Sequence, residues 1–186
     1  MIHDLELLDK LSVFPPIAFD GEVFRATRRS LDALTTSTSG GRWAPKNSVA
    51  ALYTSCETAG ALAELVFHWS QYTPLPTKPA AVHRIRLTTK KTLRFLRTDL
   101  TELGVNWDLY SEASFARTQE IGAAVAFLEC DGLIAPSARW DCENLVLFTD
   151  NHGVANDLEV LATEEVDWVA WAREHKLLPE SDQPGR

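Results

Sequence analysis

Five polar residues, spaced between positions 25 and 137, have the chemical types needed to hold a charged ligand and act on it. They are Arg25, Arg42, Tyr53, Glu64 and Ser137. Two guanidinium groups can each present a planar fork of donors to phosphate oxygens, and an aromatic ring can pack against a base. A carboxylate and a hydroxyl add a charge and a hydrogen-bonding group. The set suits the binding of a charged dinucleotide.

The common catalytic and nucleotide-binding motifs offer no competing explanation. The sequence contains no G-x-G-x-x-G, so a Rossmann-type dinucleotide site has no support. The Walker A, H-E-x-x-H and G-x-S-x-G patterns are also absent. The histidines lie in separate segments without the spacing of a metal site: His3, His68, His83, His152 and His175. We therefore expect no metal, and a dinucleotide would have to be held by a different scheme.

Glu64 falls in the middle of a helix that the apolar pattern predicts over residues 57–69. Its side chain projects away from the centre of the apolar stripe, beside Gly60 and Ala61. Small neighbours of this kind leave room for a cleft. A solvated helix glutamate is the ordinary alternative.

Arg42 follows the glycine pair Gly40-Gly41 at the end of a polar loop expected over residues 30–48. Two glycines allow the backbone to approach an anion, while the guanidinium supplies donors. An ordinary glycine turn with a solvated arginine is the alternative.

The remaining three residues have equally plain alternatives. Arg25 belongs to a basic cluster in a strand expected over residues 22–27, which is typical of a charged surface. Tyr53 suits the core of a short strand, and Ser137 suits the turn that follows Pro136. No one of the five residues defines a site by itself.

The elements that must position these residues alternate irregularly, which predicts an α+β fold with a mixed or antiparallel sheet and flanking helices. We expect helices at 4–11, 57–69 (with Ser55 as the cap), 99–104, 114–130 and 166–176. Strands are expected at 22–27, 50–54, 81–88, 93–96, 133–135, 144–149 and 158–163, of which 81–88 alternates as a half-exposed strand would.

Length and composition indicate a single domain over residues 1–178, followed by a flexible polar tail at 179–186. A chain of 186 residues that is 45% hydrophobic can bury a core. No apolar run approaches the ~20 residues that span a bilayer, and the acidic N-terminus does not resemble a signal peptide. Three cysteines without a CxxC pair suit a reducing compartment, so we expect a cytoplasmic protein without a membrane partner.

The negative charge is concentrated near the C-terminal end. Residues 150–186 hold nine acids and three bases, which account for −6 of the formal net charge of −8. The rest of the chain is nearly neutral, so no large negative field opposes phosphate binding there. A direct nucleic-acid partner is disfavoured, because such binding needs a basic face.

The order and spacing of the polar set resemble the RES family, named for its Arg, Glu and Ser. Tyr53 follows Arg42 by eleven positions, and Glu64 follows Tyr53 by eleven more. The shared motifs are G-G-R-W, a Y-T-S strand end, A-x-x-E on the next helix, T-Q-x-I-G at 118–122 and D-G-L-I-A-P-S-A at 131–138. The similarity is strongest over residues 22–150. Two positions depart from the family pattern, since Ala26 and Ala44 stand where members often carry an aromatic residue and an asparagine.

The resemblance implies a fold like that of the ADP-ribosyltransferases and an activity that consumes NAD. RES proteins are toxins of bacterial toxin–antitoxin pairs, and they cleave the bond between nicotinamide and ribose. By this resemblance Glu64 and Arg42 are the catalytic residues, and Arg25, Arg42, Tyr53 and Ser137 bind NAD. NAD is then the substrate, and no separate cofactor is expected.

The resemblance leaves the acceptor of the ADP-ribosyl group open. Phosphate would make the protein an NAD phosphorylase, water a glycohydrolase, and a protein side chain a mono-ADP-ribosyltransferase. We favour destruction of free NAD, with protein modification as the alternative. A third reading is a non-catalytic module that binds a partner through an exposed, tryptophan-rich C-terminal helix with Trp168 and Trp171. The family also implies a protein antitoxin of the Xre-like kind as partner.

Overall fold

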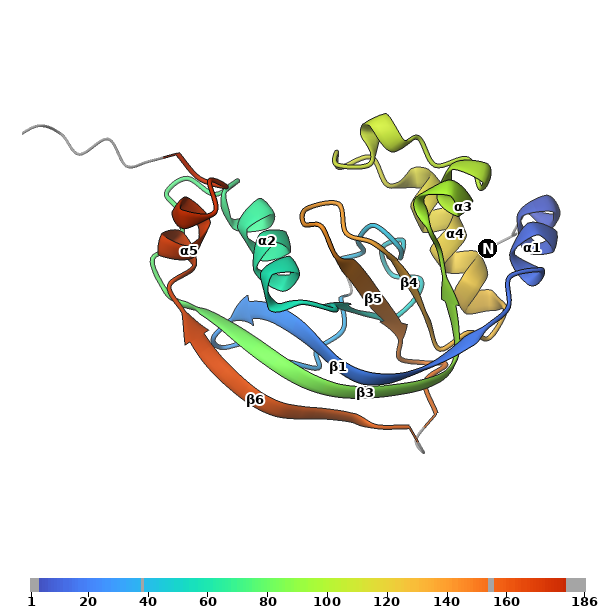
Figure 1. The fold of residues 1–186 in the computed structure, drawn as a ribbon, viewed down its shortest axis with the longest axis horizontal. Helices are drawn as coiled ribbons and strands as arrows, with labels where there is room; N and C mark the ends of the chain where they lie inside the picture. Colours follow the sequence, from blue (N-terminus) through green and yellow to red (C-terminus); the bar gives the residue numbers. More distant parts are fainter. Residues whose placement is uncertain (1–3, 38, 154–155, 180–186) are drawn as a thin grey trace, which may run out of the picture.

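Six strands pair into a mixed sheet that closes on itself, and the α-helices gather at its two ends (Figure 1). The structure is a computed structural model that describes residues 4–37, 39–153 and 156–179. Within these residues the strands are β1 (Ile17–Arg28), β2 (Ala51–Ser55), β3 (Ala80–Arg94), β4 (Gly132–Pro136), β5 (Glu143–Phe148) and β6 (Leu158–Val166). The helices are α1 (Leu5–Ser12), α2 (Thr58–Trp69), α3 (Arg97–Glu102), the 3-10 turn η1 (Trp107–Leu109), α4 (Ala116–Phe127) and α5 (Trp168–Glu174).

Strand β3 joins the two halves of the sheet. Most of β3 pairs antiparallel with β1 on one side and with β6 on the other, while Thr92–Arg94 pairs parallel with β4. From β4 the order runs antiparallel through β5 to β2, and the pair Phe24–Ser55 connects β2 back to β1. The mixed sheet predicted from the sequence is therefore confirmed, and its closure brings β1, β2 and β5 together around one region.

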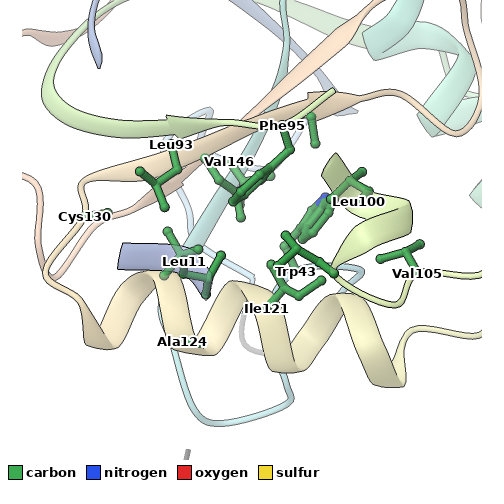
Figure 2. Close-up of a cluster of buried hydrophobic side chains, with 14 of the residues drawn as sticks. Leu11, Trp43, Leu93, Phe95, Leu100, Val105, Ile121, Ala124, Cys130 and Val146 are labelled. Carbon is green, nitrogen blue, oxygen red and sulfur yellow. The ribbon is translucent and has the colours of Figure 1, made fainter. Parts of the chain in front are cut away.

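The helices form two groups that cover opposite ends of the sheet. Helices α2 and α5 lie together at one end, and α1, α3 and α4 lie at the other (Figure 1). Beside the second group of helices lies one buried cluster of apolar side chains (Figure 2). It includes Leu11, Trp43, Phe95, Leu100 and Ile121. Burying one such side chain stabilises a fold by about 1.5–3 kcal/mol. Trp43 brings the glycine loop into this core, so the residue before it, Arg42, is held at a fixed place.

The helices expected at 57–69 and 114–130 are present as α2 and α4, and the described residues of 30–48 form neither helix nor named strand, as predicted. Two strand predictions were too short. The strand expected at 22–27 begins at Ile17, and the segments 81–88 and 93–96 are one strand, β3. A strand this long is needed because β3 pairs with β1, β6 and β4 along its length.

The segment 81–88 alternates as expected of a half-exposed strand: its odd-numbered positions are buried, whereas positions 84, 86 and 88 are at least partly exposed. Two other local expectations were wrong for reasons of packing. Glu57 rather than Ser55 is the N-cap of α2, although Ser55 Oγ accepts a weak hydrogen bond from Glu57 N at 3.4 Å. Trp168 is only 1% exposed, because it packs against Trp69 of α2.

The polar tail predicted at 179–186 lies, apart from Pro179, outside the described residues. Among the described helices, none is long and apolar enough to cross a membrane.

Candidate active site

A pocket of about 540 Å³ opens where β1, β2, β5, α2 and the glycine loop meet. Four of the five residues singled out from the sequence line it, namely Arg25, Arg42, Tyr53 and Glu64. Ser137 is not among the lining residues, but it contacts Glu64 from behind. The fold thus brings together residues that are spread over more than a hundred positions of sequence.

Glu64 is held in the pocket by two neutral donors. Its Oε1 accepts a hydrogen bond from Ser137 Oγ at 3.2 Å and another from Asn144 Nδ2 at 3.0 Å. Ser137 follows β4, and Asn144 lies on β5 beside it, so adjacent strands support one carboxylate. Hydrogen bonds of this kind fix the direction of a carboxylate.

The position of α2 depends on the absence of a side chain at Gly60, where the helix backbone packs closely against its neighbours. A Cβ at this position would collide with Ser55 Oγ and Cys142 Sγ. The first turn of α2 therefore packs directly on β2 and on the segment that follows Ser137. One helical turn later, this packing places Glu64 over its two donors.

Asn144 is the member of this group that the sequence reasoning missed. Its amide nitrogen donates to Glu64, while its Oδ1 is buried and has no partner among the described residues. A buried, unpaired amide oxygen is costly, and such atoms are frequent where a ligand supplies the missing donor. The feature of the sequence that could have identified it is its position directly before the apolar run at 145–148.

The glycine loop that carries Arg42 is fastened by both β2 and α4. Trp43 N donates to Tyr53 Oη at 3.2 Å, and Gln119 Nε2 donates to Gly41 O at 2.9 Å. A Cβ on Gly41 would lie 2.6 Å from Tyr53 Oη, so this position needs glycine. The segment T-Q-x-I-G therefore acts partly as a support for the loop.

Tyr53 has a structural contact in addition to its place in the pocket wall. Burial raises the pKa of Tyr53 to about 12, so its hydroxyl stays neutral and can accept the bond from Trp43. Its ring lines the pocket, as the packing role predicted from sequence requires.

The guanidinium of Arg42 lies in the pocket wall, and one of its nitrogens has no hydrogen-bond acceptor among the described residues. Its guanidinium carbon lies 4.6 Å from the ring centre of Tyr110 and 4.7 Å from that of Phe115. Nη1 is buried and unpaired within the described chain. Burial lowers the pKa of Arg42, while Tyr110, Glu64 and Tyr53 act in the opposite direction. Such a group gains strongly from an anion that enters the pocket.

Arg25 lies on β1 on another side of the same pocket. Its Nη1 donates to Ala33 O at 2.7 Å, which ties the strand to the start of the glycine loop. Burial lowers the pKa of Arg25, and Asp32 opposes this shift. Of its basic neighbours, Arg28 also lines the pocket, whereas Arg29 forms an ion pair with Glu165 at 2.7 Å.

Arg139 is a further pocket arginine, and the sequence reasoning did not identify it. Its guanidinium stacks on the ring of Phe67 at 3.3 Å, and its backbone N donates to Ser137 Oγ at 3.1 Å. Its Nε is buried and unpaired in the described chain, although another of its nitrogens donates to Ser111 O. Burial lowers the pKa of Arg139, and Glu64 opposes this shift. Its place in the A-P-S-A-R segment, two residues after Ser137, was the signal available.

A metal site does not form around these groups. No cluster of three or more potential metal-binding side chains occurs among residues 4–37, 39–153 and 156–179. His68 lines the pocket one turn after Glu64, and burial lowers the pKa of this imidazole. The wall therefore combines one fixed carboxylate with four arginines, which suits a ligand that carries anionic groups and a reacting centre of developing positive charge.

Comparison with known proteins identifies a family and a related fold. A family model described as the RES domain matches residues 22–169. The search of curated proteins found no match of significance. One chain in the crystal structure of the M. tuberculosis MbcT–MbcA toxin–antitoxin complex superposes with a TM-score of 0.79 and 18% sequence identity, covering 91% of this chain and 97% of that chain. At this identity the likeness concerns the fold.

Proposed function

Because the chain belongs to the RES-domain family, we propose that it is an enzyme that breaks the bond between nicotinamide and ribose in NAD. The observation that carries this proposal is the Glu64 carboxylate, fixed by Ser137 and Asn144 in a pocket with four arginines. The pocket volume of about 540 Å³ is in the range of cofactor and small-molecule sites.

The bond that breaks in this reaction joins C1′ of the ribose to the ring nitrogen of nicotinamide. The bonding electron pair goes to the ring, which leaves as neutral nicotinamide and needs no general acid. Positive charge develops on the ribosyl centre, as in glycoside hydrolysis. Glu64 stabilises that charge or holds the ribose hydroxyls, and this stabilisation is strongest in the transition state.

The arginines suit the pyrophosphate of NAD. Arg42 Nη1 and Arg139 Nε are buried donors without acceptors within the described residues. Pyrophosphate oxygens would satisfy them and replace the water that burial has removed. Arg42 and Arg25, which both line the pocket, would fix the bend of the dinucleotide and so the place of its reacting bond.

The ADP-ribosyl group passes, in this proposal, to inorganic phosphate or to water. The oxygen of the acceptor forms the new bond to C1′, and the acceptor loses a proton to solvent. With phosphate the protein is an NAD phosphorylase, and with water it is a glycohydrolase. The two differ only in the acceptor, so the same first step precedes both.

The experiment that tests the function follows nicotinamide release from NAD by purified, EDTA-treated protein. Mass spectrometry identifies the other product with and without inorganic phosphate. ADP-ribose phosphate supports the phosphorylase, ADP-ribose supports the glycohydrolase, and ADP-ribose attached to protein supports a mono-ADP-ribosyltransferase. If no nicotinamide appears under any of these conditions, the enzymatic proposal fails. Glu64→Gln is the inactive control.

The biological role that we propose is that of a toxin whose activity an antitoxin restrains. The related fold comes from a toxin–antitoxin complex, which supports a protein partner for this chain. An Xre-like protein that covers the pocket is the partner we propose. Coexpression with such a partner should protect cells that the chain alone inhibits, and Glu64→Gln should need no protection.

A partner-binding role without catalysis has lost its main support. That reading relied on an exposed tryptophan surface on α5, but Trp168 is buried. Trp171 is half-buried and packs against Trp140 and His175.

A further inference from the structure

A column of three aromatic rings and two arginines begins at the pocket wall. Arg42 lies between the rings of Tyr110 and Phe115, with its guanidinium carbon 4.6 and 4.7 Å from their centres. Tyr110 also stacks on Trp107, with ring centres 4.3 Å apart and planes within 10°. Arg97 caps the column at 4.7 Å from the Trp107 ring. The pocket arginine is thus one layer of an ordered stack.

The two rings that contact Arg42 are attached to the elements that build the site. Tyr110 is 5% exposed, and its hydroxyl donates to Pro136 O at 2.7 Å, directly before Ser137. Phe115 is the residue that precedes α4, and Gln119 of that helix holds Gly41. Motion of either ring is therefore limited by the same contacts that fix the two sides of the pocket.

Glu64 and Arg42 carry opposite charges in one partly enclosed pocket, and they attract each other. An arginine side chain is long enough to fold towards a carboxylate across such a space. Yet in the described part of the chain, no ion pair within 4.0 Å joins these two residues. Glu64 is held by neutral donors, and Arg42 is held by neutral rings.

We propose that Tyr110 and Phe115 form a clamp that keeps Arg42 away from Glu64, so that both charges remain available to the ligand. The clamp works through stacking, which holds the guanidinium plane while it leaves Nη1 without a protein acceptor. An internal ion pair would satisfy each charge with the other and would close the pocket to an anion. Tyr110 and Phe115 are positioning residues in this role.

The proposal rests on the proposed function only in its choice of ligand. The separation of the two charges is a property of the free protein, so a structure without ligand can test it. Binding is tested with ADP-ribose, which carries the pyrophosphate of NAD but lacks nicotinamide. The proposed reaction therefore cannot consume it during the measurement.

The main variant is Phe115→Leu in the full chain, with Phe115→Tyr as its conservative control. Phe115 is half-buried, so the chain should still fold. A crystal structure of Phe115→Leu is expected to show Arg42 displaced from the Tyr110 ring and within ion-pair distance of Glu64. Phe115→Tyr should keep the arrangement of the parent protein.

Calorimetry with ADP-ribose gives the second measurement. Phe115→Leu should weaken binding about tenfold, because the ligand then has to displace Arg42 from Glu64. In a Glu64→Gln background the same substitution should have little effect, because no carboxylate then attracts Arg42.

Two results would overturn the clamp. One is a Phe115→Leu structure in which Arg42 stays in place. The other is an equal loss of ADP-ribose affinity with Glu64 and with Glu64→Gln, which would show that Phe115 contacts the ligand itself. If the parent protein binds no ADP-ribose, the proposed function fails, and the crystal structure alone still decides the clamp.

Discussion

The hydroxyl of Ser137 lies 3.2 Å from the carboxylate of Glu64 and donates a hydrogen bond to it. The same Oγ accepts from the backbone N of Arg139 at 3.1 Å, so its proton is directed towards Glu64. Ser137 thus links the carboxylate to the segment that carries a pocket arginine. Sequence reasoning placed Ser137 against the ligand, whereas its observed contact is a support behind Glu64.

Glu64→Gln should abolish NAD consumption and cellular toxicity while the fold stays intact. The amide keeps the size of the side chain and still offers an oxygen to Ser137 and Asn144. It lacks the charge that would stabilise the ribosyl centre, so kcat should fall by roughly 10²–10³. Nicotinamide release measures the effect, and thermal unfolding checks the fold. Turnover near that of the parent would remove Glu64 from the reaction.

Asn144→Ala should lower kcat by roughly tenfold to a hundredfold. The substitution removes one of the two donors to Glu64 Oε1, and a hydrogen bond to a charged group contributes about 1.5–3 kcal/mol. Steady-state kinetics would show the loss mainly in kcat, with a smaller change in KM.

Asn151→Ala is the matched control for that substitution. Asn151 Nδ2 donates to Ala126 O at 2.8 Å and to Cys130 O at 2.9 Å, among residues that do not line the pocket. Its loss should lower stability and leave kcat per folded molecule unchanged. If both asparagine variants reduce kcat equally, the contact between Asn144 and Glu64 has no special part in turnover.

Gly122→Ala should disorder the attachment of the Arg42 loop. A Cβ at this position would collide with the carbonyl oxygen of Trp43, which is backbone and cannot rotate aside. The loop or α4 has to shift, so we expect a loss of stability of about 1–3 kcal/mol and weaker NAD binding. Gly153→Ala is the control, since the nearest atom to its Cβ would be 3.8 Å away. Equal effects of both changes on the Michaelis constant would contradict this account.

Local pattern was enough to predict most elements but not their partners in space. The apolar periodicity of residues 57–69 gives α2 closely, because a helix depends on neighbours within one or two turns. The length of β3 was not predictable in the same way. The polar run at 88–92 interrupts the alternation, and pairing with two neighbour strands carries the strand across it.

The same distinction explains which site residues were found. Arg42 and Glu64 stand beside glycine or small residues, and this local feature pointed to them. Asn144 and Arg139 act through partners far away in sequence; Asn144 is 80 positions from Glu64. Tyr110 is a similar case, because its ring meets Arg42 only after α3 and α4 have packed around it.

Acid should destabilise the fold through His83. This imidazole is buried between β1 and β6, with Nε2 2.9 Å from Thr27 Oγ1 and Nδ1 2.9 Å from Thr163 Oγ1. Burial lowers the pKa of His83 from its usual 6.5, and Arg25 lowers it further, against an opposing effect of Asp32. The unfolded chain therefore binds a proton at a higher pH than the folded chain does, and stability falls as the pH drops through about 6.5.

Denaturant unfolding at about pH 7.5 and about pH 5.5 measures this effect. The parent protein should lose stability at the lower pH, and His83→Gln should lose less because its side chain does not titrate. The glutamine amide can still donate and accept, so the variant is expected to fold. The same pH dependence in both proteins would assign acid sensitivity to other groups.

Trp171→Ala should reduce turnover, although Trp171 does not line the pocket. Its ring lies 5.8 Å from that of Trp140 and 4.2 Å from that of His175, which itself lies 5.6 Å from Trp140. Trp140 follows Ser137 and Arg139 in the same loop. Helix α5 therefore holds the loop that supports Glu64, and loss of the ring should let that loop move. A small misplacement of such groups costs roughly tenfold or more in rate.

The measurement for Trp171 separates positioning from simple loss of stability. Trp171→Phe keeps a ring in contact with Trp140 and should recover most of the turnover. Leu161→Ala, on the exposed face of β6, should change neither rate nor unfolding temperature. If Trp171→Ala lowers the unfolding temperature while kcat per folded molecule stays at the parent value, the ring cluster contributes to stability alone. A fall in kcat that Trp171→Phe reverses would instead show that α5 helps to order the site. Most of α5 lies beyond residue 169, where the family match ends.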